Sequence, residues 1–197
     1  MEMTVILELL VASVWGYLLG AVPTGVLVCR IVRAPDAHHN GSRHTGGSNV
    51  ARLAGIWAGA LTAAIDILLG FGAVAGAALL TGSPWAAAAA GVMAVVGHNW
   101  SVFIGFGGGI GLSSLFGGLV GFAPLPALAA LIALAVLWFA LSRLLHLHRA
   151  RATILTMAAV GPLLWALGFS WPCILLGVLG GVVVILKTLP DLNREYG

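Results

Sequence analysis

Charged residues are scarce in this chain. Only 8% of its 197 residues are Asp, Glu, Lys or Arg, against about a quarter in an ordinary soluble domain. A water-soluble surface cannot be built from so few charges, whereas 60% of the residues are hydrophobic. Cysteine is also rare. Cys29 and Cys173 are expected near opposite ends of the helix stack, too far apart for a disulfide.

Long uncharged runs predict membrane segments, because about 20 apolar residues cross the hydrocarbon core. Gly, Pro and charged residues divide the chain into seven such segments, near 5–29, 53–80, 85–97, 112–122, 125–141, 153–169 and 172–187. The first four residues lack the basic start of a secretory signal, so we expect the first helix to be retained. The fold class predicted is an all-α, polytopic membrane helix bundle, forming a single domain over residues 1–197.

The basic residues predict the orientation. With the N-terminus outside, seven passes place all nine Lys and Arg residues on the cytoplasmic side, as the positive-inside rule requires. Trp85 and Trp171 then lie at outer ends, where aromatic belts occur. Because this rule explains the formal net charge of +3, we expect no nucleic acid among the partners.

The third and fourth segments, at 85–97 and 112–122, are too short to span at about 1.5 Å per residue. Their connection, Gly97–Gly111, is glycine-rich and apolar enough to re-enter the membrane. Broken backbone in lipid is tolerated only where protein or a cavity receives it, so this loop points to a binding site. A transport function, the weakest of the alternatives, rests on this feature alone.

Two loops on the predicted cytoplasmic side, 41–52 and 97–111, offer flexible backbone. Successive N–H groups ahead of a helix can bind phosphate, and Gly105–Gly111 directly precedes the fourth segment. No Gly-Lys-Ser/Thr follows, and Ile110 occupies the third glycine position of a dinucleotide fingerprint. The pattern alone is therefore a weak indication of phosphate binding.

Several motifs nevertheless follow one another in a recognisable order: Tyr17–Gly25, Gly41-Ser42, Gly46 with Ser48–Arg52, Asp66, Gly97-His98, and Val102-Phe103 through Gly111. In this order the chain resembles the bacterial glycerol-3-phosphate acyltransferases that take their acyl group from acyl phosphate, small seven-helix enzymes of phospholipid synthesis. The resemblance implies the bacterial inner membrane, with the C-terminus cytoplasmic. It also implies membrane lipids, acyl phosphate and glycerol 3-phosphate as partners, with no cofactor and no metal.

The resemblance implies a site in which Arg52 and His98 are catalytic. Residues expected to bind substrate or phosphate are Ser42, Arg43, Asn49, Gly108, Gly109, Gly111 and Arg143. Arg43 and Arg143 are included as substitutes for lost cations. Gly107 and Ile110 stand where the family has two lysines, and Arg43-His44 stand where it has Gly-Asn. The family's C-terminal His-Arg-x-Asn-Ile motif is not recognisable in 187–191.

These departures remove cations from a site where two substrates bring about three to four negative charges together. We therefore expect a catalytically impaired relative that serves as a lipid-binding or structural subunit of a larger membrane complex, for example a respiratory or photosynthetic one. The alternative is an active acyltransferase that makes lysophosphatidic acid in phospholipid synthesis.

Single polar residues leave alternatives open. Asp66 lies mid-segment, where a charge costs about 2.5–3.5 kcal/mol, so it should face inward with a partner, for structure or for function. His98 is either a general base or a cap of the glycine-rich loop. The pairs His38-His39 and His146/His148 lack the spacing of a metal site.

Overall fold

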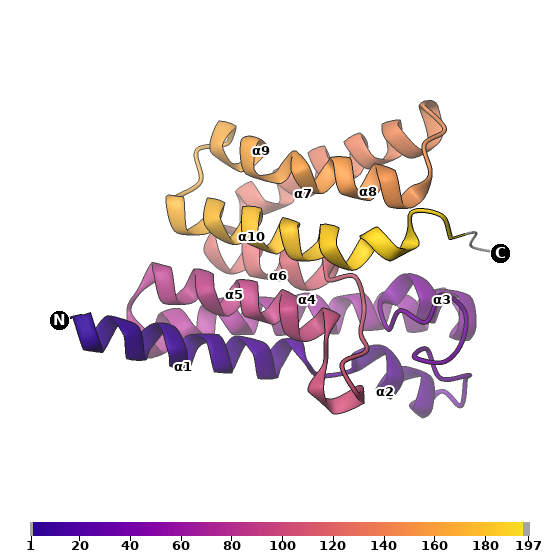
Figure 1. Cartoon of the computed structure of the whole chain (residues 1–197), viewed down its shortest axis with the longest axis horizontal. Coiled ribbons are helices and arrows are strands. Elements are labelled where there is room, and N and C mark those ends of the chain that lie inside the picture. Colours follow the sequence, from indigo (N-terminus) through magenta and orange to yellow (C-terminus); the bar gives the residue numbers. More distant parts are fainter. Residues whose placement is uncertain (1, 195–197) are drawn as a thin grey trace.

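The structure, a computed structural model, describes residues 2–194, whose regular elements are all helical apart from one isolated bridge between Ser101 and Gly107. The predicted all-α fold is confirmed. The α-helices shown in Figure 1 are α1 (Glu2–Gly20), α2 (Thr24–Ile31), α3 (Gly47–Ala54), α4 (Ile56–Thr81), α5 (Pro84–Asn99), α6 (Leu112–Phe122), α7 (Pro124–Phe139), α8 (Arg149–Ala158), α9 (Val160–Ala166) and α10 (Trp171–Thr188). A π-helical turn, Ala140–Leu144, extends α7, and 3₁₀ turns occupy Val102–Ile104 and Leu189–Asp191.

Two of the predicted segments are interrupted in the structure. The first is divided between α1 and α2 at Pro23, which has no N–H to continue the helical ladder. The sixth begins at Arg149 rather than at 153, and it breaks at Ala159 between α8 and α9. Pro162 lacks the N–H that would bond the Ala158 carbonyl, so the helix changes course there.

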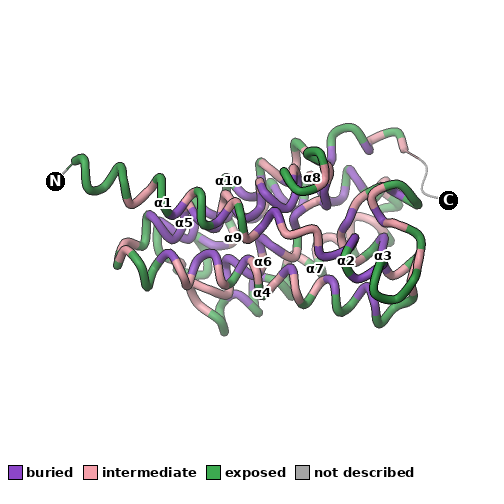
Figure 2. Tube along the Cα trace, turned by 90° about the horizontal axis from the view of Figure 1, so that it is seen from below, coloured by how far each residue is buried: buried purple, intermediate pink, exposed green. Residues whose placement is uncertain are grey.

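Apolar helices of membrane-crossing length account for much of the chain. Among residues 2–194, four are long and apolar enough, at Glu2–Ile31, Ile56–Thr81, Pro124–Leu144 and Trp171–Asp191, while α6 is a shorter apolar helix. Large hydrophobic side chains also remain exposed, such as Leu79 at 87% and Trp57 at 86%. Exposed residues line the outer side of the helices, including the projecting start of α1 (Figure 2). The seven-pass count and the re-entry of the glycine-rich loop stay predictions.

Glycines allow the helices to approach closely. Gly16 and Gly20 of α1 face the backbone of Ala90 and Ala94 in α5, where an added Cβ would overlap the carbonyl oxygens. The same relation holds between Gly117 of α6 and the backbone of α4. Small residues at such spacing let backbones meet without side chains between them. This close packing holds α1, α4, α5 and α6 together as one wall of the bundle.

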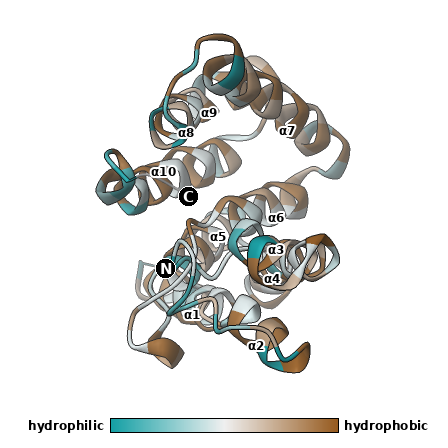
Figure 3. Cartoon of the chain, turned by 90° about the vertical axis from the view of Figure 1, so that its right-hand side faces the viewer, coloured by the Kyte–Doolittle hydropathy of each residue, from teal (hydrophilic) through white to brown (hydrophobic). Residues whose placement is uncertain are grey.

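Polar segments gather at one end of the bundle. Figure 1 shows the α4–α5 and α9–α10 connections at the end where the chain begins, and the α7–α8 connection at the opposite end with α3 and the C-terminus. Hydrophilic residues of α3 and the start of α8 appear among the hydrophobic helices when this opposite end is viewed directly (Figure 3). The loops that carry the sequence motifs therefore converge on one region.

Candidate active site

A cavity of about 500 Å³ opens within the bundle, between the first loop, α3, α4, α5, α6, α7, α8 and α10. One part of its wall is polar and comes from the loops and helix ends described above. The rest of the wall is apolar and comes chiefly from α6, α7 and the α8–α9 segment. The cavity therefore offers two chemically different environments to one ligand or to two adjoining ligands.

Asn49 of α3 organises the polar end. Its buried side chain accepts a hydrogen bond from the Ser42 N–H at 3.0 Å, and its Nδ2 donates to the carbonyls of Ala37 and Asn40 at 3.1 and 3.0 Å. These bonds fold the first loop against the start of α3, with Ser42 and Asn49 at the cavity wall. Arg52, one turn further along α3, also lines the cavity.

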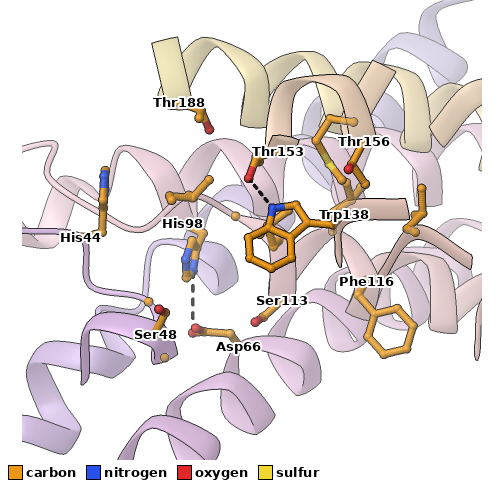
Figure 4. Close-up of a pocket in the computed structure, with 18 of the residues that line it drawn as sticks. His44, Ser48, Asp66, His98, Ser113, Phe116, Trp138, Thr153, Thr156 and Thr188 are labelled. Carbon is orange, nitrogen blue, oxygen red and sulfur yellow. Dashed lines mark hydrogen bonds and ion pairs between the residues drawn. The ribbon is translucent and has the colours of Figure 1, made fainter. Parts of the chain in front are cut away.

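A buried polar pair joins α4 to α5 beside the cavity. Asp66 is 2% exposed and accepts a hydrogen bond from the Thr24 hydroxyl. The same carboxylate oxygen lies 3.6 Å from His98 Nδ1 (Figure 4). Within the described residues, the second oxygen of Asp66 has no hydrogen-bond partner. Asp66 thus holds one edge of the His98 ring, a partnership that the sequence spacing did not reveal.

The glycine-rich loop folds back onto His98. The Gly109 N–H donates to the His98 carbonyl at 3.0 Å, and the Thr45 N–H of the first loop donates to the Gly108 carbonyl at 3.3 Å. A Cβ at Gly109 would overlap His98 Nε2, and a Cβ at Gly108 would overlap the backbone of His98 and Asn99 at the end of α5. Gly111, with φ of +91°, leads into α6. Glycine is required here for close approach, since any side chain would push the loop away from His98.

The apolar end is formed by side chains such as Phe116, Leu119, Leu131 and Met157. Trp138 of α7 lies between this end and the polar end, and its indole Nε1 donates to Thr153 Oγ1 at 3.1 Å (Figure 4). A hydrocarbon chain is favoured in such surroundings, because apolar surface is removed from water.

Two basic side chains that were not predicted also reach the cavity. His44 lines it and is held by Asp191, with His44 Nε2 2.6 Å from Asp191 Oδ2. Arg149, the first residue of α8, also lines it. His44 and Asp191 lie 147 positions apart in the sequence, so no local pattern could have paired them.

The predicted site residues are only partly brought together. Those that line the cavity are Ser42, Asn49, Arg52, Asp66, His98 and Gly111. Gly108 and Gly109 lie behind it in the glycine-rich loop, and Arg43 and Arg143 are exposed and outside its wall. No cluster of three or more metal-ligating side chains occurs within residues 2–194. The functional roles of these residues remain predictions.

Fold and site together indicate an integral membrane protein with a cavity that is polar at one end and apolar at the other. Comparison with known proteins is more specific. The chain belongs to the glycerol-3-phosphate acyltransferase family, whose profile matches residues 10–195. A glycerol-3-phosphate acyltransferase of Synechococcus sp. (strain JA-3-3Ab) is 38% identical over 189 residues, which cover 95% of this chain and 90% of the relative.

Solved structures agree with this assignment. The integral membrane glycerol 3-phosphate acyltransferase PlsY (YgiH) in its glycerol 3-phosphate form matches with a TM-score of 0.79 and 26% identity, covering 94% of this chain and 90% of PlsY. The lysophosphatidic acid form of PlsY matches with a TM-score of 0.77 and 25% identity at the same coverage.

These findings correct our expectation of a catalytically impaired subunit of a membrane complex. The relatives are named as acyltransferases, and the matching structures are the glycerol 3-phosphate and lysophosphatidic acid forms of an acyltransferase. Our inference from the lost lysines was wrong. It considered only Arg43 and Arg143 as substitute cations, and both lie outside the cavity wall. The structure brings His44 and Arg149 to the same cavity from other parts of the chain.

Proposed function

We propose that this protein transfers an acyl chain from acyl phosphate to glycerol 3-phosphate and so makes lysophosphatidic acid. The observation that carries this proposal is the two-part cavity, polar and cationic at one end and apolar at the other. Both substrates carry a phosphate, which suits the polar, cationic end of the cavity. One substrate also carries a long hydrocarbon chain, which suits the apolar end.

In the reaction, the sn-1 hydroxyl oxygen of glycerol 3-phosphate attacks the acyl carbonyl carbon. A carbon–oxygen ester bond forms, the bond between the carbonyl carbon and the phosphate oxygen breaks, and inorganic phosphate leaves with the hydroxyl proton. No covalent intermediate on the protein is needed. The contribution of the protein is to place the two substrates together and to stabilise negative charge on the transferring oxygens.

We assign Ser42 and Arg52 to the glycerol 3-phosphate end, and we assign Asn49 the role of positioning Ser42 there, because its amide is fully used in hydrogen bonds to the first loop. We assign His98 a positioning role. Its Nδ1 lies 3.6 Å from Asp66 Oδ1, and its backbone carbonyl accepts a hydrogen bond from the Gly109 N–H of the glycine-rich loop. In this arrangement Asp66 and His98 fix the glycine-rich loop rather than take the hydroxyl proton.

The experiment is an assay of purified protein in mild detergent with acyl phosphate and labelled glycerol 3-phosphate. We expect labelled lysophosphatidic acid from glycerol 3-phosphate. When labelled glycerol replaces it, we expect no labelled monoacylglycerol, because glycerol lacks the phosphate that the cationic end binds. Product formation no greater than in a preparation from cells without the protein would reject the proposal.

We also propose that the chain is a single domain of seven passes in the bacterial inner membrane, with the N-terminus outside and the C-terminus cytoplasmic. Walls contributed by helices from α3 to α10 support a single domain. The gathering of basic residues at one end of the bundle supports the orientation.

A further inference from the structure

The glycine-rich loop brings no lysine or arginine to the cavity. Gly107 does not line it, and Ile110 lines it with an aliphatic side chain. Among the described residues, the arginines that line the cavity are Arg52 of α3 and Arg149 of α8, and no lysine does so. A phosphate bound against α6, α7 and α8 therefore lies on the side of the cavity to which Arg149 belongs, whereas Arg52 lines the cavity from α3.

Arg149 stands at the head of a helical stripe that faces the cavity. The lining residues of α8 and α9 follow it at helical spacing: Ala150, Thr153, Thr156, Met157 and Val160. Along this stripe the side chains change from cationic through hydroxyl to apolar. At 1.5 Å per residue, Arg149 and Met157 are separated by about 12 Å along α8. The stripe thus matches a single-chain lipid with a phosphate at its head.

The local structure favours an anion beside Arg149. α8 begins at this residue, and His148 caps the helix by accepting a hydrogen bond from the Ala150 N–H at 3.3 Å. The positive end of the helix dipole adds to the guanidinium charge. Arg149 is exposed and forms no hydrogen bond or ion pair with the residues described. Its guanidinium is available to a phosphate bound in the cavity that it lines.

We propose that Arg149 binds the phosphate of the acyl donor, and so provides from α8 a cation that the glycine-rich loop lacks. This assignment rests on the proposed acyltransferase function. It divides the two arginines of the cavity between the substrates, with Arg52 on the acceptor and Arg149 on the acyl phosphate. The planar guanidinium suits this task, because it binds phosphate through two parallel N–H groups.

The test compares Arg149→Ala with Arg151→Ala, a matched control that removes the same charge from an exposed residue of α8 outside the cavity wall. We expect Arg149→Ala to raise KM for acyl phosphate roughly 10- to 100-fold, with little change in KM for glycerol 3-phosphate. Arg151→Ala should change neither constant. An Arg149→Ala variant that behaves like Arg151→Ala, or that raises only KM for glycerol 3-phosphate, overturns the assignment.

A second-site variant separates binding from a structural role. Ile110 lines the same cavity from the loop, so Ile110→Lys in the Arg149→Ala background should bring KM for acyl phosphate back toward the parent value. Failure of this rescue in a double variant that elutes as the parent does in gel filtration also counts against the assignment. If the parent protein shows no turnover, the proposed function fails. Arg149 is then tested by whether Arg149→Ala, but not Arg151→Ala, weakens binding of acyl phosphate to the purified protein.

Discussion

Arg52 and His98 line the same cavity but face different partners. Arg52 projects from α3 at the polar end, where its Nε donates to the Ser48 carbonyl at 3.3 Å. His98 is enclosed between Asp66 and Gly109. The first residue brings a permanent positive charge to the cavity, whereas the second connects α5 to its neighbours.

We therefore expect Arg52→Ala to reduce kcat/KM for glycerol 3-phosphate more than His98→Ala does. Loss of a charge-assisted contact to phosphate is worth about 1.5–3 kcal/mol, or roughly 10- to 100-fold in kcat/KM. Arg52→Lys should recover part of this loss, because the charge remains while the paired N–H geometry is lost. Steady-state kinetics of the three purified variants provide the measurement.

Equal kcat/KM values for Arg52→Ala and the parent would remove Arg52 from the site. A loss in His98→Ala that exceeds that of Arg52→Ala, without loss of folded protein, would instead favour His98 as the general base, the alternative that its imidazole left open.

At the scale of helices, the contact between α1 and α5 depends on the absence of side chains. We expect Gly16→Ala to destabilise the protein by about 1–3 kcal/mol, as overpacking of a filled interior usually does. The added methyl group would overlap the Ala90 carbonyl. The lowered stability should appear as earlier thermal loss of the monodisperse protein in detergent.

Gly72→Ala in α4 is the matched control. A Cβ there meets only Leu19 Cδ1, at an ordinary 3.8 Å. Thermal stability should stay close to that of the parent. If Gly16→Ala also unfolds at the same temperature as the parent, α1 is free to shift, and the close packing between α1 and α5 does not contribute to stability.

Helix bounds were largely predictable from sequence, whereas the site was predictable only where motifs are local. The apolar run 112–122 coincides with α6, because a run bounded by glycine and proline leaves little choice of ends. The start of α8 was missed by four residues, since Arg149 and Arg151 interrupt the hydropathy although they continue the helix. Ser42 and Asn49, which belong to the local motif 41–52, are in direct contact through the Ser42 N–H, and their predicted role in substrate binding stays a prediction.

The missed contacts all join distant parts of the chain. His44 contacts Asp191, and His98 lies beside Asp66. The periodicity of apolar residues along one sequence does not tell which segments pack against each other, so it could not predict these pairs. Arg149 was overlooked for the same reason, because its approach to the cavity depends on how α8 packs beside α7 and α10. Counting cations motif by motif therefore gave the wrong function, although the family had been identified correctly.

At the scale of the whole molecule, the segregation of charge has consequences for substrate access. The polar end of the cavity opens where the first loop, the start of α8 and the end of α10 meet. If this end faces the cytoplasm, as the basic residues predict, glycerol 3-phosphate enters from water while the acyl chain lies at membrane depth between α6, α7 and α8. The orientation is therefore part of the proposed function.

Cysteine labelling tests this orientation directly. Ser170, in the α9–α10 connection, is exposed, and Leu145, in the α7–α8 connection, is 64% exposed. Cys29 and Cys173 are both 0% exposed, so the parent protein should give little background. A membrane-impermeant maleimide added to intact cells should label Ser170→Cys and leave Leu145→Cys unlabelled until the membrane is permeabilised. Labelling of Leu145→Cys alone would mean that the orientation is the reverse of the one proposed. Labelling of both positions from outside would mean that the α8–α9 segment between them does not cross the membrane, and the seven-pass prediction would then fail.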